Sequence, residues 1–404
     1  MVQPALHFNY QTNNMYNRTA NFIIAGAGML LFGITLITLG SVLPDLKIKF
    51  GLDDVAAGAL FAILPFGILA GSLLFGYFCD RYGYRYLLAA NCLLIAIGLA
   101  GIAYLKSITL LQCCIFGFGF GGGCVNGATN ALVADISGKN KGANLSLLGV
   151  FFAIGALGIP LILGFLKNEV DFEKILYATA FLALLVAIAV MMLQFPPGKN
   201  VNNLDAFHVF RLFKNEVLLL IAFFLFFQSS LEAIVHNWIT TYIQEGLKIP
   251  ADKALYALTA NVIGMAVMRL LTGSIFRKQS DSTMLQVSML MLIIGSILLL
   301  FGKSFTPVLI ALVTLGAGMA AGFPMMYSIV GTRHADISAT AFSFILTIAL
   351  LGNMLINYIM GVVAKYYGIH SVAPVILMES VTMSLLCYII LQKINREKVI
   401  LKET

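Results

Sequence analysis

The sequence has few charged residues and little else to cover a soluble surface. Only 11% of its 404 residues are Asp, Glu, Lys or Arg, and 60% are hydrophobic. Soluble domains carry about 25% charged residues and need polar side chains over most of the surface. Apolar runs of about eighteen residues or more recur along the whole chain, and each can cross a hydrocarbon layer roughly 30 Å thick. The composition therefore excludes an ordinary soluble domain and predicts a protein embedded in a lipid bilayer.

Signals for cofactors and for catalysis are also scarce. The six cysteines lack the paired spacing of a disulfide framework or a zinc site. They are Cys79, Cys92, Cys113, Cys114, Cys124 and Cys387. A P-loop, an H-E-x-x-H helix and a G-x-S-x-G turn are missing, and the glycine-rich run 117–123 lies inside an apolar segment with no strand before it. We therefore expect no cofactor, no metal site and no enzymatic activity.

Twelve apolar runs predict twelve transmembrane helices, because a lipid-exposed backbone must satisfy its own hydrogen bonds. The expected spans are 20–44, 55–79, 86–105, 108–134, 142–166, 173–194, 217–243, 252–276, 282–301, 306–331, 337–364 and 370–393. The predicted fold class is an all-α membrane protein made of two six-helix halves. Residues 1–194 and 217–404 form the halves, and residues 195–216 form a polar linker between them.

The net charge of +7 comes from basic residues scattered singly between the apolar runs. Nucleic-acid binding needs such charges clustered in a patch, so no nucleic-acid partner is expected. Fifteen of the 25 basic residues lie on the side of both chain ends and nine on the other, while Arg269 lies inside a span. Because cytoplasmic loops are enriched in Lys and Arg, both termini are expected in the cytoplasm. The short loops are typical of a bacterial inner-membrane protein.

The glycines of the two halves repeat at a constant offset of 197 residues. The aligned pairs are Gly67/Gly264, Gly76/Gly273, Gly119/Gly316, Gly121/Gly318, Gly155/Gly352 and Gly164/Gly361. Glycine lets helix backbones approach closely in a bilayer, so the repeat preserves packing points. Two repeated halves around a site near mid-membrane are typical of alternating-access transporters.

The loop between the second and third spans contains Gly76, Asp80, Arg81, Gly83 and Arg85 in the order G-x-x-x-D-R-x-G-x-R. This pattern resembles the signature of the major facilitator superfamily. Together with the twelve spans, the linker and the duplication, the resemblance covers the whole chain.

The resemblance implies that Asp80 lies against the N-terminal end of span 11, where exposed amides and the positive helix pole favour a carboxylate. Arg81 and Arg85 would join Asp135 in a charge cluster that keeps the cytoplasmic side closed in the outward-facing state. Tyr84 occupies a position that is often basic in the family, which predicts a cluster with fewer charges. The alternative is that these charges form only a solvated turn.

A narrower resemblance is to the fucose/galactose/glucose–proton symporter branch. Span 7 contains Glu232, Trp238 and Tyr242 in the pattern E-x-x-x-x-x-W-x-x-x-Y. Span 5 contains the F-F-x-x-G-A of residues 151–156, and span 8 carries Arg269 between two glycines.

The branch's coupling carboxylates in spans 1 and 4 align with Gly40 and Asn126 of this chain. Neither replacement can carry a proton. Proton symport by those two positions is therefore excluded, although transport is not.

Polar residues inside span 7 indicate a functional face. Gln228, Glu232 and His236 are spaced i, i+4, i+8 and share one side of the helix. An ionisable group at this depth needs a cavity, a partner or a function. We expect this face to line the transport cavity, with a polar seam between helices as the alternative. Glu232, together with His236, is the candidate proton carrier, since an imidazole exchanges protons near neutral pH.

Further polar side chains are candidates for binding a hydroxyl-rich solute. They are Asn126, Asn130, Asn353, Asn357 and Tyr327. Carboxamides offer both donors and an acceptor, but they also bridge helices. Trp238, the only tryptophan, fits either a sugar-stacking or an interface-anchoring role. Arg269 lies ~12 Å inside span 8, against ~22 Å for Glu232, so a structural or gating role is favoured over solute contact.

These features predict a secondary transporter of a small polar solute, most simply a monosaccharide or polyol, with protons as candidate coupling ions. We expect a monomer. Two alternatives remain open: a proton-driven exporter of drugs or metabolites, and a non-transporting membrane sensor on the same fold.

Overall fold

The chain forms a bundle of long helices. The computed structural model describes residues 16–51, 54–166, 169–199, 212 and 214–403, and within these residues there is no strand. The first six long helices are α1 (Arg18–Phe50), α2 (Asp54–Tyr82), α3 (Tyr84–Tyr104), α4 (Ile108–Ile136), α5 (Lys141–Leu166) and α6 (Phe172–Met192). The others are α8 (Glu216–Thr241), α9 (Ala251–Gly273), α10 (Asp281–Phe301), α11 (Phe305–Met319), α12 (Gly322–Arg333), α13 (Ser338–Tyr367) and α14 (Val372–Glu403).

Twelve segments of the described chain are long and apolar enough to cross a membrane. This confirms the prediction of an all-α membrane protein with twelve spans. The tenth span differs from the expected continuous helix 306–331, because α11 ends at Met319 and α12 begins at Gly322. Pro324, in the first turn of α12, has no N–H to donate to the carbonyl of Ala320, which favours a break there.

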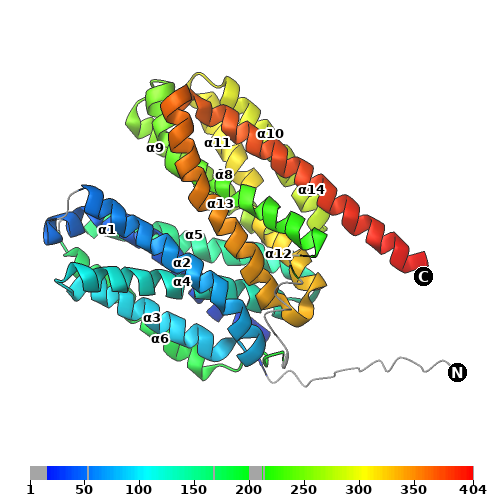
Figure 1. Cartoon of the computed structure of the whole chain (residues 1–404), viewed down its shortest axis with the longest axis horizontal. Coiled ribbons are helices and arrows are strands. Elements are labelled where there is room, and N and C mark those ends of the chain that lie inside the picture. The colour runs from blue at the N-terminus through cyan, green and yellow to red at the C-terminus, as the bar shows by residue number, and fades with distance from the viewer. Residues whose placement is uncertain (1–15, 52–53, 167–168, 200–211, 213, 404) are drawn as a thin grey trace.

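The helices pack as two similar groups (Figure 1). In the first group α2 packs against α4, α1 against α5, and α3 against both α6 and α4. In the second group α9 packs against α11, α8 against α13, and α10 against both α14 and α11. These are the same pairs of spans, counted from the start of each group.

Equivalent glycines make these equivalent contacts. A Cβ on Gly67 would lie 2.4 Å from the Phe116 carbonyl oxygen, and one on Gly264 would lie 2.5 Å from that of Val313. Gly264 and Val313 lie 197 residues after Gly67 and Phe116, respectively. Gly119 against Leu64 and Gly316 against Asn261 repeat the relation. The repeat seen in the sequence is therefore a repeat of helix crossings.

Gly155 on α5 is a packing point at which the need for glycine at a close helix crossing can be tested. A Cβ there would lie 2.0 Å from the carbonyl oxygen of Leu30 on α1, whereas a Cβ on Gly158 of the same helix meets no atom within 4 Å. We expect Gly155→Ala to destabilise the protein by about 1–3 kcal/mol through overpacking. Gly158→Ala, the matched control, should leave stability unchanged or slightly raised. Thermal unfolding of both variants in detergent measures the difference, and equal melting temperatures would contradict the close α1–α5 contact.

The two groups contact each other mainly near the side on which α6 ends and α8 begins, which we term the linker side. The principal contacts between groups are α2 with α13, α5 with α9 and α5 with α12. The closest approaches lie near the linker ends of these helices, at Gly76 against Ala339 and at Gly273 against Leu147. Toward the opposite side the two groups diverge (Figure 1). The structure is therefore closed on the linker side.

Candidate functional site

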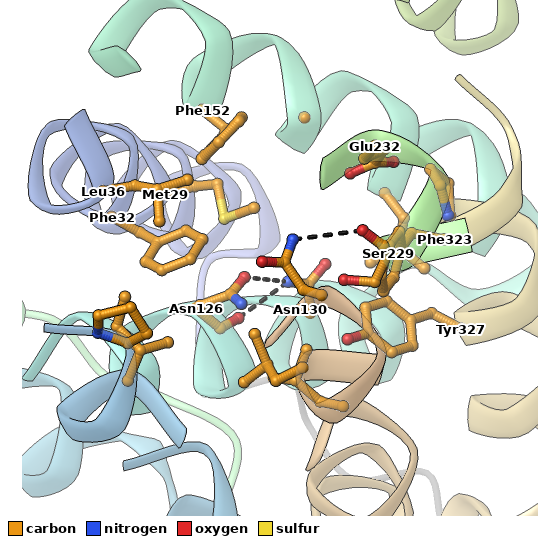
Figure 2. A pocket seen from close by; sticks show the side chains of 18 of the residues that line it. Met29, Phe32, Leu36, Asn126, Asn130, Phe152, Ser229, Glu232, Phe323 and Tyr327 are labelled. Atoms are coloured by element: carbon orange, nitrogen blue, oxygen red, sulfur yellow. Dashed lines mark hydrogen bonds between the residues drawn. The ribbon is translucent and has the colours of Figure 1, made fainter. Parts of the chain in front are cut away.

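A cavity lies between the two groups of helices, beyond the closed linker side. Its polar lining comes from both groups and consists of Asn126, Asn130, Ser229, Glu232, Arg269, Tyr327 and Asn353. Apolar side chains of α1 and α5 form much of the facing wall, among them Met29, Phe32, Leu36 and Phe152 (Figure 2). The cavity thus has one amide-rich region and one apolar wall.

The asparagines of α4 form a bonded pair in this cavity. Asn130 Nδ2 donates to the backbone carbonyl oxygen of Asn126 at 2.8 Å and to its side-chain Oδ1 at 3.1 Å. Both residues lie one helical turn apart on the cavity wall (Figure 2). Asn126 Nδ2 and Asn130 Oδ1 bond to no described residue, so the pair presents one donor and one acceptor to a solute.

The second asparagine pair is only half in the cavity. Asn353 of α13 lines it and donates to the Ser229 carbonyl oxygen at 3.2 Å. Asn357 lies one turn farther from the linker side and is bonded to Asn353 and to Asn237, as expected of a helix-bridging amide. The structure therefore brings Asn126, Asn130 and Asn353 together and leaves Asn357 outside the lining.

The polar face of α8 divides into three environments. Glu232 lines the cavity, and its Oε1 accepts a 2.8 Å bond from Gln228 Nε2. Gln228 is fully buried and does not line the cavity, which differs from the expected position. It lies at the break in the tenth span, where its Nε2 also donates to the Met319 carbonyl oxygen at 3.0 Å. His236 is exposed one turn beyond Glu232 and is also outside the cavity lining.

Gln228 explains why Gly322 follows the break. A Cβ on Gly322 would lie 2.4 Å from Gln228 Oε1, so any larger residue would displace the amide. Gln228 thus satisfies the free carbonyl at the end of α11 and links the Glu232 carboxylate to the junction of α11 and α12.

The aromatic candidates occupy different places. Tyr327 of α12 lines the cavity and stacks on Phe342, with ring centroids 4.6 Å apart. Trp238 is half-buried, packs over Gly361 of α13 and does not line the cavity. Tyr242, one turn farther along, is buried at the end of α8. This placement favours a packing role for Trp238 over contact with a solute in this conformation.

Arg269 of α9 reaches the cavity from the second group and touches the first. Its side chain is 8% exposed, lies over Gly149 of α5 and donates to the Gly149 carbonyl oxygen at a long 3.5 Å. Among the described residues no carboxylate lies within 4 Å of the guanidinium, although Glu232 lines the same cavity. The placement at the contact between groups agrees with a gating position, and the residue also lines the cavity.

The closed linker side is held at Asp80. Its carboxylate accepts bonds from the backbone N–H of Ala339 at 3.3 Å and of Thr340 at 2.7 Å, and from the Thr340 hydroxyl at 2.7 Å. These residues form the first turn of α13, where unpaired N–H groups and the helix dipole attract an anion. Gly76, one turn earlier, makes room for this contact, because a Cβ there would lie 2.5 Å from the Ala339 carbonyl oxygen.

Lys199 of the linker completes this contact. Its Nζ lies 3.5 Å from Asp80 Oδ1 and 3.0 Å from Asp135 Oδ2. Asp135 also accepts from Ser338 at 2.8 Å and from the Tyr84 hydroxyl at 2.6 Å. We name Asp80, Asp135, Lys199, Ser338 and Thr340 the linker latch. Lys199 was not predicted from the sequence, because a lysine in a loop has no helical periodicity that indicates its position.

Arg81 and Arg85 lie outside the linker latch, which corrects the expected cluster. Arg81 is bonded to the Tyr77 hydroxyl and stacks on aromatic rings, and Arg85 donates to the carbonyl oxygen of Met191. Gly83 has φ of 81°, a left-handed conformation that suits glycine and turns the chain into α3. Both arginines therefore bond elsewhere, while Asp80 points toward the first turn of α13.

A second buried acid was not predicted from the sequence. Glu379 of α14 is 3% exposed and accepts a 2.5 Å bond from Ser230 of α8, next to the cavity residue Ser229. An acid in an apolar span is a detectable signal. The structure places it behind α8, away from the cavity lining.

Comparison with known proteins agrees with this architecture. The model of the Major Facilitator Superfamily matches residues 25–355. An uncharacterized transporter of Sinorhizobium fredii, y4wD, is 22% identical over 370 residues, covering 90% of this chain and 93% of that one. The sodium-dependent glucose transporter 1A of Mus musculus is 28% identical over 136 residues, covering 34% of this chain and 32% of that one.

Among solved structures, that of the E. coli fucose:proton symporter FucP is similar, with a TM-score of 0.76 at 18% identity, covering 91% of this chain and 98% of that chain. The likeness extends over both groups of helices and concerns the fold. With twelve spans and a family model matched over most of its length, this chain belongs to the Major Facilitator Superfamily, as a multi-pass membrane transporter and not an enzyme.

Proposed function

We propose that this chain is a secondary transporter that moves a small polar organic solute, a monosaccharide or similar polyol, by alternating access. The two halves, residues 1–194 and 217–404, would rock about the cavity as the linker latch opens and closes. The observation that carries the proposal is the polar cavity shared by both halves, next to a contact that closes only one side.

The chemistry of the lining favours a hydroxyl-rich solute. Asn126, Asn130 and Asn353 supply carboxamides, and Tyr327 supplies a phenol and an aromatic face. Carboxamides both donate and accept, which matches hydroxyl groups that do the same. The sugar transporters among the similar proteins agree with this choice.

Coupling to protons would run through Glu232. By the resemblance, Gly40 and Asn126 align with the branch's coupling acids, so proton coupling would need another acid. Glu232 is the carboxylate that lines the cavity, and His236 lies one turn away on the open side. In this proposal the latch faces the cytoplasm, both termini are cytoplasmic, and the protein works as a monomer in the inner membrane.

Uptake into proteoliposomes tests the proposal. We expect at least one of a panel of radiolabelled hexoses, 6-deoxyhexoses and amino sugars to enter, and an inward proton gradient to drive its accumulation. Asn130→Ala, which removes a cavity amide, should weaken apparent affinity about tenfold, or roughly 1–2 kcal/mol. Asn140→Ala is the matched control, because Asn140 is exposed in the short 3-10 helix between α4 and α5. Absence of uptake across the whole panel would overturn the sugar proposal.

One observation keeps the exporter as a second candidate. The cavity wall formed by Met29, Phe32, Leu36 and Phe152 is apolar and includes a flexible methionine, which suits greasy solutes. Resistance profiling of cells that express the protein distinguishes the two, because an exporter would raise tolerance to amphipathic compounds and a sugar importer would not.

A further inference from the structure

Arg269 is a buried cation without an ion pair, and it lines the solute cavity. Its side chain is 8% exposed, and its one bond among the described residues is the 3.5 Å contact from Nη1 to the Gly149 carbonyl oxygen. Nε is buried without a partner. A desolvated guanidinium is strongly disfavoured unless an anion or several acceptors compensate it. This site therefore has unused capacity for an anion.

The other charge in the cavity does not fill that capacity. Glu232 also lines the cavity but lies beyond ion-pair distance of Arg269, and its carboxylate is bonded to Gln228. The remaining titratable group of the lining is Tyr327, and His236 lies outside it. An anion bound at Arg269 would thus face one carboxylate, whose charge a proton can remove.

We propose that the transported solute carries a carboxylate as well as hydroxyl groups, as a sugar acid does, and that Arg269 binds this carboxylate. Guanidinium is the side chain best suited to a carboxylate, because its planar donors pair with both oxygens. The hydroxyl groups would bind Asn126, Asn130 and Asn353. This inference rests on the proposed function, which it narrows from neutral sugars and polyols to their acids.

The charges in the cavity then determine how solute and proton movement are coupled. In this proposal the empty cavity would hold Arg269 as a cation and Glu232 as an anion. Binding of one carboxylate together with one proton on Glu232 keeps the sum of charges unchanged. Transport of one acid anion with one proton moves no net charge, whereas a neutral sugar with one proton moves one positive charge.

Counterflow in proteoliposomes with matched probes tests the inference. D-glucuronate against D-glucose, and D-galacturonate against D-galactose, differ in having a carboxylate. We expect the wild-type protein to prefer a uronate over its neutral partner at least tenfold. Arg269→Gln should lower uronate exchange at least tenfold more than exchange of the neutral sugar and so abolish that preference, and Arg269→Lys, which keeps the charge, should retain part of it. A potassium diffusion potential set with valinomycin should not change proton-driven uronate uptake.

Arg277→Gln is the matched control, because Arg277 also bonds across the two halves, to Asn144 at 2.9 Å, but lies outside the cavity lining. Exchange of neutral sugars alone, unaffected by Arg269→Gln, would overturn this inference and leave the proposed function standing. Loss of uronate and neutral sugar to the same extent in Arg269→Gln would assign Arg269 a structural role and also overturn it. No exchange of any of the four probes would overturn both this inference and the proposed function. If Arg269→Gln does not fold, two wild-type measurements test the inference. They are the preference for uronate over neutral sugar and the effect of the potassium diffusion potential on proton-driven uronate uptake.

Discussion

Replacing Glu232 by glutamine is expected to abolish accumulation driven by a proton gradient while sparing solute exchange. Glu232 is the carboxylate of the cavity lining, and Gln228 Nε2 holds its Oε1 at 2.8 Å. A glutamine has nearly the same shape, and its Oε1 can accept the same bond. The variant therefore removes the proton-carrying group and keeps the packing.

The measurement is accumulation in proteoliposomes with an inward proton gradient, beside counterflow without a gradient. We expect accumulation to fall at least tenfold and counterflow to stay within about twofold of wild type, since a transporter without its coupling group still exchanges solute. Glu245→Gln is the matched control, because Glu245 follows the same helix but is exposed outside the cavity. Full gradient-driven accumulation by Glu232→Gln would exclude Glu232 as the coupling site.

Replacing Asp80 by asparagine is expected to open the linker side. The Asp80 carboxylate receives two backbone N–H bonds and one hydroxyl bond from the first turn of α13, and Lys199 lies 3.5 Å away. An asparagine loses the charge and turns one acceptor into a donor that faces other donors. Charge-assisted bonds contribute about 1.5–3 kcal/mol each, so we expect the closed state to lose roughly 2–4 kcal/mol relative to the open one. That shifts the equilibrium about 30- to 1000-fold.

Distances between spectroscopic labels on the linker side measure this shift. Tyr86 on α3 and Ile275 after α9 are both exposed and lie on different halves. The labels are best introduced as unnatural amino acids, because the native Cys113 is exposed. We expect a longer label distance in Asp80→Asn and a tenfold or greater loss of transport.

Asp171→Asn is the control, since Asp171 makes an exposed ion pair with Lys174 that is worth little. An unchanged label distance in Asp80→Asn would show that Asp80 does not hold the linker side closed.

Both predictions concern residues that the sequence already singled out, and the reasons differ. Glu232 is detectable because a carboxylate deep in an apolar span is costly and therefore conspicuous. Asp80 is detectable because its loop resembles a family signature. Their partners were harder to find. Gln228 shares a helix face with Glu232, yet it is fully buried at the break between α11 and α12.

The linker latch shows a second limit. The resemblance pointed to Arg81 and Arg85, but the positive φ of Gly83 turns the chain so that both lie outside the cluster. Lys199 enters it instead, because residues 196–199 run beside this loop and the Lys199 N–H donates to the Asp80 carbonyl oxygen at 2.8 Å. A loop residue's destination depends on contacts remote in sequence, which no local pattern encodes.

The sequence by itself determined the twelve spans, the duplicated packing glycines and the presence of ionisable groups inside the membrane. These follow from local properties, since the bilayer selects apolar helices of sufficient length and close crossings require glycine. Only the tertiary structure decided which polar side chains share the cavity, that Arg269 reaches it without an ion pair, and that the linker side is closed. The physical reason is that a side chain's surroundings depend on helix rotation and on neighbours from the other half, and each residue along a helix turns by about 100°.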